Sequence, residues 1–571
     1  MDSWSKGAKL NKILIILGLA AQAAFGQLTL DQKIADFQEI VGLYAKNYGP
    51  YEWKRDNFGF DLLNAAPWMD KIKATKDDLS FYEVLSEYVS KLNDAHDSYT
   101  LPSNFTARLN FSVDIYDGKL LVDFINRTRL PAAEFPFVNG YELVSIDGQD
   151  ATAFLQTLLR YEVAANLRST SRFAATLLTS RFQTLMPHAA DVPEISTVVL
   201  RRPDATLETY RIPWTKSGLA LTTVGKYLTA SSTLAQSEGE ESPTDEMPAY
   251  LAPLLRLQNC RIADRTVVGF GALTPIFALS LPDSFDQRLG SFSDPFFSGV
   301  FEAGGFKIGF IRIPSYSPAN TASALTAFQK EMAYFQANTE GLVIDDMRNP
   351  GGSVAYTNQI LSLLMPKDWQ SVGFEVRATS SWVTSISSSV EQAKAAGAPT
   401  SVIDLLEAIK RPIVQANAEF RGRTPSIPLD DVEIRRSPAT DSLGKVLAYT
   451  KPLIVLIDEL SASGAEVFAA SIQDNARGSL VGWRTMGAGG NVTGRRAGSY
   501  SLGSTSVTES LMNRGRDIVT AEHPPAPYVE NIGVRPDVTV DYMSSENLYQ
   551  SGKPFVDAFV AAMINQIQKS R

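Results

Sequence analysis

The sequence predicts a multidomain α/β protein with a mostly parallel sheet in its largest domain, preceded by a helical region and a β-rich domain. Three patterns support this prediction: a helical apolar period near the N-terminus, a group of short strands after it, and strands alternating with helices from about Phe301 onward. Such alternation is typical of domains in which helices connect parallel strands. A chain of 571 residues is long enough for two or three domains, each with its own core.

Residues 1–26 have the pattern of a signal peptide. Three lysines lie within residues 6–12, an apolar run covers residues 13–20, and small residues precede Gln27. An apolar run this short does not comfortably span a bilayer. We therefore expect cleavage near Gln27, export as a secreted, extracellular protein, and no stable membrane anchor afterwards. An uncleaved anchor is the alternative.

Residues 27–103 form the predicted helical region. Apolar side chains recur there at helical spacing on one face of each segment: Ile34, Phe37, Ile40 and Val41, then Phe81, Val84, Leu85 and Val89. The region ends in the loop Asn-Asp-Ala-His-Asp-Ser at residues 93–98, which contains His96.

Residues 104–215 form the predicted β-rich domain, with strands expected at residues 109–115, 119–125, 198–202 and 209–213. The run Gly-Tyr-Glu-Leu-Val-Ser-Ile-Asp-Gly at residues 140–148 indicates a short strand closed by an Asp-Gly turn, and a helix is expected at residues 151–159. This run is similar to the signature of PDZ domains, except that Tyr141 replaces the first acid. The resemblance implies a PDZ-like domain, a class that binds extended peptides at a sheet edge.

The second half of the chain divides into a linker and the α/β domain. Residues 216–290 show no clear period, and residues 231–248 are rich in Ser, Glu, Pro and Thr, which predicts a flexible linker. Residues 291–571 form the predicted α/β domain. Its expected strands are residues 307–313, 341–346 and 453–458, and its expected helices are residues 322–338, 355–365 and 465–475.

Composition excludes several classes of function. With 62 acidic and 53 basic residues the chain carries a formal charge of -9, which argues against nucleic-acid binding. The single cysteine, Cys260, excludes an intramolecular disulfide and is expected to be buried and inert. Three scattered histidines give no zinc spacing, so we expect neither a metal nor a cofactor. Four sequons, at Asn104, Asn110, Asn126 and Asn491, would allow glycosylation in a eukaryotic host.

Ser463 stands where a predicted apolar strand turns into a helix. A serine at that junction lies near backbone N–H groups and the positive end of the helix dipole, which suits a nucleophile and a developing oxyanion. Ser463 and Glu466 also match the Ser-x-x-Glu pattern of a capping box, which requires no catalysis. Two glycine-rich turns accompany this motif: one ends in Gly351 and Gly352, and the other covers residues 481–490 and lacks the Gly-Lys-Ser/Thr ending of a P-loop.

In this order and spacing, the three motifs resemble those of the C-terminal-processing (tail-specific) serine peptidase family. The resemblance covers about residues 301–538, and the PDZ-like and helical segments extend it over most of the chain. It implies a crotonase-like catalytic core, polypeptide substrates and serine endopeptidase activity. Ser463 would be the nucleophile, and backbone N–H groups of Gly464 and of Gly351 or Gly352 would form the oxyanion hole.

One departure from the family's motif determines the expected base. Many members carry Thr-Phe-Gly-Lys-Gly, whose lysine is the base, but Ala488 stands at that position here and no lysine lies between Lys451 and Lys553. A branch represented by tricorn protease and the chlamydial protease-like activity factor uses Ser, His and Glu instead. His96 stands where that branch has its histidine, before the PDZ-like segment, and a reference pKa near 6.5 suits a base at neutral pH.

The branch's glutamate matches Glu530, in the run Glu-Asn-Ile-Gly-Val-Arg-Pro-Asp at residues 530–537. We expect Glu530 to orient the catalytic histidine through its hydrogen-bond network, if necessary through a hydroxyl or water, with Glu522 as the alternative carboxylate. His96 has rivals in His188 and in His523, and its own alternative is an ordinary loop histidine.

Other functions stay open at this point. The same scaffold serves as a carrier in interphotoreceptor retinoid-binding protein, so a non-catalytic ligand-binding protein is the main alternative, and peptide scaffolding through the PDZ-like segment is another. Residues 231–248 could act as a self-cleaved inhibitory segment. A homodimer is left open as the oligomeric state.

Overall fold

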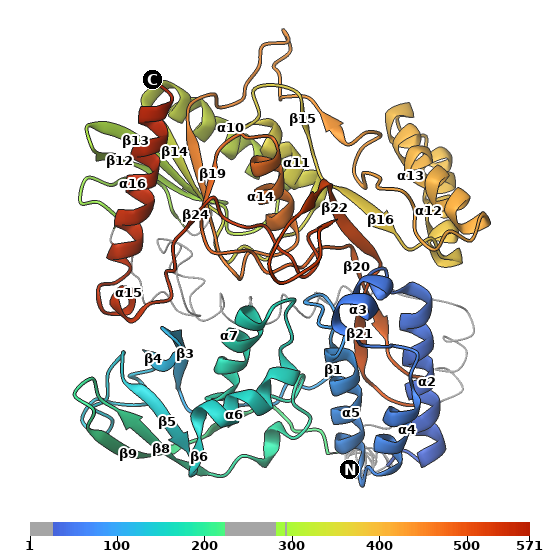
Figure 1. Ribbon diagram of the computed structural model, residues 1–571, viewed down its shortest axis with the longest axis vertical. Helices are drawn as coiled ribbons and strands as arrows, with labels where there is room; N and C mark the ends of the chain where they lie inside the picture. The colour runs from blue at the N-terminus through green and yellow to red at the C-terminus, as the bar shows by residue number, and fades with distance from the viewer. Residues whose placement is uncertain (1–26, 223–280, 292–293) are drawn as a thin grey trace, which may run out of the picture.

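The computed structural model describes residues 27–222, 281–291 and 294–571 (Figure 1). The predicted signal peptide, residues 231–248 and Cys260 lie outside these ranges. No helix within them combines the length and the apolar character needed to cross a membrane.

The N-terminal region is helical, as predicted. It contains α2 (Leu30–Asn47), α3 (Tyr51–Phe58), α4 (Ala66–Lys73) and α5 (Asp78–Ser90). The predicted apolar faces of α2 and α5 pack into one buried cluster, with Ile34 and Val41 at its partly exposed edge. Strand β1 (Tyr99–Thr100) pairs with β21 (Ser504–Thr508), which pairs with β20 (Val492–Arg496). A hairpin from late in the sequence therefore lies beside the N-terminal helices (Figure 1).

The PDZ-like domain is built on an antiparallel sheet of order β3-β4-β5-β8-β9. Its strands are β3 (Phe111–Tyr116), β4 (Lys119–Ile125), β5 (Glu142–Ile146), β8 (Ile195–Arg201) and β9 (Leu207–Pro213), with β6 (Gln149–Asp150) on β5. Helices α6 (Ala151–Leu158) and α7 (Leu167–Leu177) and the short helices η2 (Leu159–Tyr161) and η3 (Ala189–Asp191) complete it. A second sheet contains β10 (Thr215–Ser217), β2 (Thr106–Arg108) and β7 (Ser180–Phe182).

The α/β domain contains a seven-stranded sheet of order β11-β12-β13-β14-β18-β19-β24. Its strands are β11 (Asp286–Leu289), β12 (Phe297–Ala303), β13 (Phe306–Arg312), β14 (Gly341–Asp345), β18 (Leu453–Ile457), β19 (Ser479–Gly482) and β24 (Val538–Thr539). The strands from β13 to β24 are parallel, whereas β11, β12 and β13 pair antiparallel. The sheet is therefore mixed, with a parallel core.

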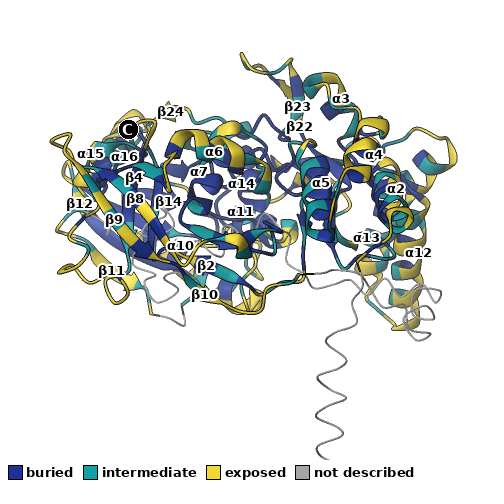
Figure 2. Cartoon of the chain, turned by 90° about the horizontal axis from the view of Figure 1, so that it is seen from below, coloured by how far each residue is buried: buried dark blue, intermediate teal, exposed yellow. Residues whose placement is uncertain are grey.

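Helices cover both faces of this sheet. One face packs against α10 (Thr321–Asn338), α11 (Val354–Ser362) and α14 (Gly464–Asp474), and the other packs against α16 (Lys553–Lys569). In Figure 2 α14 lies in the buried interior, whereas α12 (Ser380–Ala395) is largely exposed. Burial on every side explains the apolar run of residues 453–457, since both faces of β18 are covered.

The other elements of this domain lie around the sheet. They are α13 (Thr400–Ala418), which pairs with α12, α15 (Ser545–Tyr549), β15 (Trp369–Gln370), β16 (Gly373–Val376), β17 (Arg435–Arg436), β22 (Ser510–Ile518) and β23 (Ala526–Tyr528).

Two predicted boundaries shift. Strand β10 pairs with β2 although it extends past residue 215, and β11 joins the seven-stranded sheet although it precedes residue 291. Both strands are short and mostly polar, so neither has the apolar alternation by which a strand is recognised in a sequence. The predicted linker of residues 216–290 is therefore too long at both ends.

Candidate active site

Three loops converge at the carboxyl ends of neighbouring parallel strands. Strands β14, β18 and β19 lie side by side, and the Gly351 turn, the Ser463 turn and the loop carrying Ala488 follow them in turn. Because parallel strands end at the same sheet edge, loops far apart in the sequence meet there. The three motifs, which are far apart in the sequence, therefore lie close together in the structure.

Ser463 has a strained backbone at the start of α14. Its φ is 56° and its ψ is -114°, a conformation that costs a non-glycine residue roughly 1–3 kcal/mol. Such a sharp strand-to-helix turn presents the side chain at the surface of the turn. Ser463 is half-buried, although the residues around it are fully buried. The geometry is that of an accessible serine held at a helix N-terminus.

The Gly351–Gly352 turn packs directly against Ser463. A Cβ on Gly351 would lie 2.8 Å from Cβ of Ser463 and 2.4 Å from N of Gly464, so only glycine fits there. The Gly351 N–H donates to Oδ1 of Asn349 at 2.9 Å. Within the described residues, the N–H groups of Gly352 and Gly464 make no hydrogen bond. Of the two glycines predicted for an oxyanion hole, the geometry therefore favours Gly352, and Gly351 provides the close approach.

Glu466 connects the Ser463 turn to the third loop. Its buried carboxylate accepts from the N–H of Ser463 at 3.1 Å, from Oγ1 of Thr485 at 2.5 Å, and from the N–H groups of Gly487 and Ala488 at 2.7 Å each. Burial raises the pKa of Glu466 to about 7, and these donors counteract that rise. The predicted capping box is thus present, and it also fixes the loop that carries Ala488.

The loop of His96 is anchored on strand β21. The N–H of His96 donates to Oδ1 of Asp94 at 2.9 Å, and its carbonyl accepts from Oγ of Ser506 at 2.5 Å. Oδ1 of Asp97 accepts from the N–H of Thr508 at 2.9 Å. These contacts hold a fully buried histidine in a defined position.

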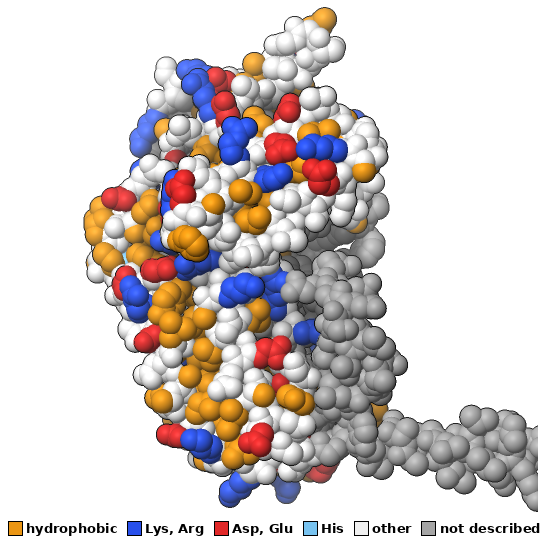
Figure 3. All heavy atoms as spheres, turned by 90° about the vertical axis from the view of Figure 1, so that its right-hand side faces the viewer, with side chains coloured by type: hydrophobic (Ala, Val, Ile, Leu, Met, Phe, Trp, Pro, Cys, Tyr) orange, Lys and Arg blue, Asp and Glu red, His pale blue; other side chains and the backbone are white. Residues whose placement is uncertain are grey.

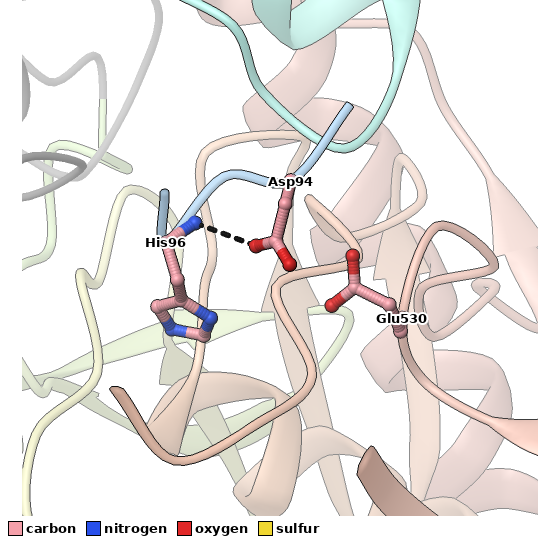
Figure 4. A group of neighbouring side chains, drawn as sticks. All are labelled: Asp94, His96 and Glu530. Carbon is pink, nitrogen blue, oxygen red and sulfur yellow. Dashed lines mark hydrogen bonds between the residues drawn. The ribbon is translucent and has the colours of Figure 1, made fainter. Parts of the chain in front are cut away.

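Glu530 lies close to His96 (Figure 4). Asp94, His96 and Glu530 each place a side-chain donor or acceptor atom within 4.8 Å of the other two, and all three residues are buried. Oε2 of Glu530 accepts from the N–H of Gly489 at 3.0 Å, so Glu530 is also tied to the loop of Ala488. The structure brings together two groups of predicted residues: Ser463 with its glycines, and His96 with Glu530.

The two groups adjoin one buried cluster. The cluster contains Ala95, which precedes His96, and Ala462, which precedes Ser463. It also contains Ala488, which stands at the family's lysine position. Small side chains allow the three loops to approach closely.

A buried lysine that the sequence analysis missed completes the network. Nζ of Lys54, on α3, donates to Oε1 of Glu530 at 2.5 Å, to Oδ1 of Asn531 at 2.8 Å and to the carbonyl of Asn93 at 2.8 Å. The side chains of Lys54 and Glu530 are 1% and 0% exposed, so this is a desolvated ion pair.

Electrostatics keep His96 neutral. Burial lowers the pKa of His96 to about 4; Asp94 raises it and Lys54 lowers it. Burial and then Asp94 raise the pKa of Glu530, whereas the ammonium of Lys54 lowers it and favours the charged carboxylate. A neutral imidazole at neutral pH can accept a proton, which general-base catalysis requires.

The rival residues lie elsewhere. His188 is half-buried and its Nδ1 lies 3.1 Å from Asp191, and Glu522 is exposed and pairs with Arg535 at 2.9 Å. His523 is half-buried against the rings of Trp53 and Phe58. None of the three joins the group of Asp94, His96 and Glu530.

That group has a donor set that could bind a divalent cation, contrary to the expectation of no metal site. However, each carboxylate oxygen already accepts a hydrogen bond. The donors are His96 N–H and Tyr48 Oη for Asp94, and Lys54 Nζ and Gly489 N–H for Glu530. The Lys54 ammonium also supplies the positive charge that a cation would bring.

We therefore expect EDTA to leave turnover of a quenched peptide unchanged, since the carboxylates are held by protein donors. A zinc peptidase assayed in parallel provides the positive control. Loss of turnover that added Zn²⁺ or Ca²⁺ restores would contradict this prediction.

The activity should persist at unusually low pH. Because the pKa of His96 is lowered to about 4, the base stays unprotonated at pH 5–6, where a histidine of ordinary pKa near 6.5 becomes charged. As pH falls, kcat/KM should decrease with an apparent pKa near 4, measured over pH 3.5–8 with stability checked at each pH. An acid limb at pH 6.5 or above would contradict the burial of the base.

Comparisons with known proteins identify two of the domains. Residues 307–540 match the sequence model of peptidase family S41, and residues 105–221 match a PDZ domain. A protein of Chlamydia trachomatis is 25% identical and covers 96% of both chains, and one of Chlamydia pneumoniae is 24% identical over 99% of this chain and 95% of its own. The solved structure of mature CPAF complexed with lactacystin has a TM-score of 0.71 and 23% identity, covering 95% of this chain and 99% of the other.

These matches define the chain as a serine-type peptidase that acts on polypeptides. More particularly, it carries a peptidase family S41 domain joined to a PDZ domain, with the overall fold of CPAF. The carrier alternative is set aside, and the prediction of a C-terminal-processing peptidase fold is confirmed.

Proposed function

We propose that the chain is a secreted serine endopeptidase in which Ser463 is the nucleophile, His96 the base and Glu530 the supporting carboxylate. The observation that supports this proposal is a strained, accessible serine with two backbone N–H groups that make no hydrogen bond among the described residues. The residue before Ser463 shares a buried cluster with the residue before His96, and His96 in turn lies near Glu530. Nucleophile, base, orienting group and oxyanion donors are the parts that acyl transfer requires.

In the proposed reaction, His96 removes the hydroxyl proton of Ser463 as Oγ attacks the peptide carbonyl carbon. The N–H groups of Gly464 and Gly352 stabilise the tetrahedral oxyanion. The imidazolium then gives its proton to the leaving amine, and a water molecule, deprotonated by the same histidine, hydrolyses the acyl-enzyme. The negative charge of Asp94 favours the imidazolium during these steps, and Glu530 holds Lys54 and the loop of Ala488 in place.

A fluorophosphonate probe tests the assignment. The wild type should be labelled, whereas Ser463→Ala and His96→Ala should not be. Labelling retained in Ser463→Ala would overturn the assignment of Ser463 as the nucleophile. Full labelling in His96→Ala would overturn the assignment of His96 as the base. Melting curves of the variants show whether each is folded.

Secretion is proposed from the pattern of residues 1–26. Expression in a secreting host should give an extracellular protein whose N-terminal sequence begins at or near Gln27. Retention of the protein in the membrane fraction with an intact N-terminus would support the uncleaved anchor instead.

A further inference from the structure

A cavity lies where the helical region, the PDZ domain and the catalytic domain meet, apart from Ser463. It has a volume of about 880 Å³ and receives side chains from α3, from the segment around α7, and from the loop after β19. In Figure 1, α7 lies at the border between the PDZ and catalytic domains. A cavity of this size exceeds the needs of a small ion and suits several residues of a peptide.

The cavity is cationic although the whole chain is acidic. Five cationic residues and one acid, Glu522, line it: Lys91, Arg160, Arg168, Arg484 and Arg535. By contrast, the face shown in Figure 3 has basic and acidic side chains interspersed. A chain with a net charge of -9 therefore concentrates positive charge in one hollow.

Two of the cations have no acidic partner. Arg168, Arg160 and Arg535 pair with carboxylates within 3.4 Å. Among the described residues, neither Lys91 nor Arg484 forms an ion pair. Burial and then Arg535 lower the pKa of Arg484 to about 10, although the carboxylates of Glu466, Glu522 and Glu459 raise it. A ligand anion in direct contact would further stabilise the charged guanidinium.

The remaining lining contributes apolar surface. Phe58, Leu159, Val163 and Trp483 lie along the same cavity. A mixture of cationic and apolar surface fits a ligand with both carboxylates and apolar side chains.

Arg484 also connects the cavity to the candidate active site. It donates to the carbonyl of Asn531 at 2.6 Å and to the carbonyl of Thr485 at 3.3 Å. Asn531 follows Glu530 and contacts Lys54, and Thr485 donates to Glu466. Arg484, which lines the cavity, therefore contacts residues that in turn contact the catalytic network.

We propose that this cavity binds an acidic, partly apolar stretch of a polypeptide substrate, away from the bond that Ser463 cleaves. This inference rests on the proposed peptidase function and adds a substrate class to it: proteins with an acidic segment beside the cleaved one. Carboxylates of that segment contact Arg484 and Lys91, and its apolar side chains lie against Trp483 and Phe58.

Binding of a fluorescent peptide to the Ser463→Ala protein tests the site without requiring turnover. A peptide that alternates Asp or Glu with Leu or Phe should bind at least 10-fold more tightly than the same peptide with Asn and Gln. Arg484→Gln should weaken binding by about 10-fold, since it removes a charge-assisted contact. Lys91→Gln, at an exposed position, provides a second variant that should fold normally and weaken binding. Arg129→Gln removes an equal charge from an exposed position outside the cavity and should leave binding unchanged.

Equal binding of the acidic and neutral peptides, or unchanged binding in both Arg484→Gln and Lys91→Gln, would overturn the proposal. So would inorganic phosphate that binds as tightly as the peptide, because the site would then hold a small anion. Failure of the wild type to react with the fluorophosphonate would instead count against the catalytic assignment, which this binding assay does not use.

Discussion

Replacing His96 with alanine is expected to lower kcat by about 10⁴-fold or more, since triad members act as a unit. The protein should still fold, because the loop is held by the backbone N–H and carbonyl of His96 and by the side chain of Asp97, all of which remain in the variant. Steady-state turnover of a quenched peptide or a protein substrate measures the effect.

The double variant Ser463→Ala/His96→Ala makes this prediction sharper. If the two side chains act in one step, the double variant should be about as slow as the slower single variant. If the fold losses in kcat of the two single variants multiply in the double variant, the two side chains have independent roles. His188→Ala, at a half-buried histidine that contacts Asp191 outside the candidate site, is the matched control and should keep full activity. A large loss in that control with normal activity in His96→Ala would reassign the base.

Much of the fold could be predicted because its elements carry strong local signals. Strand β18 is fully buried, and the start of α14 is marked by Ser463 and Glu466, so pattern and structure agree closely there. Ser463, His96 and Glu530 could be selected because each stands in a recognisable run of residues. Parallel strand order, which the sequence does not state directly, brings Ser463 to its glycine turn. The positions of His96 and Glu530 depend instead on contacts of their loops with β21 and Gly489.

The supporting residues could not be predicted, for a physical reason. Lys54 lies in α3, a short helix of low hydropathy, and a lysine there is normally exposed. Its burial arises only because α3 packs against the segment around Glu530, 476 residues later in the chain. Asp94 was more accessible to prediction, since it lies two residues before His96 and an aspartate at that spacing commonly binds the following backbone. Gly352 can be preferred to Gly351 as an oxyanion donor only once the structure shows that the Gly351 N–H already donates to Asn349.

Replacing Lys54 with methionine is expected to destabilise the fold by roughly 3–5 kcal/mol, because it leaves the buried Glu530 carboxylate without its cation. It should also lower kcat by about 10²-fold, since Lys54 lowers the pKa of Glu530 and its removal lets that carboxylate take up a proton. Thermal unfolding and turnover measure the two effects.

Two further measurements separate positioning from simple stability. Lys33→Met removes another buried lysine of the helical region, one that lies 3.6 Å from Asp78, and should reduce stability while kcat stays within about threefold of the wild type. In addition, Lys54 lowers the pKa of His96, so its removal should shift the acid limb of kcat/KM to higher pH. An unchanged acid limb, together with a kcat loss no larger than that of Lys33→Met, would restrict Lys54 to a structural role. A shifted limb would show that this lysine sets the charge of the base, so that the chain keeps a lysine near its catalytic centre although none occupies the family's usual position.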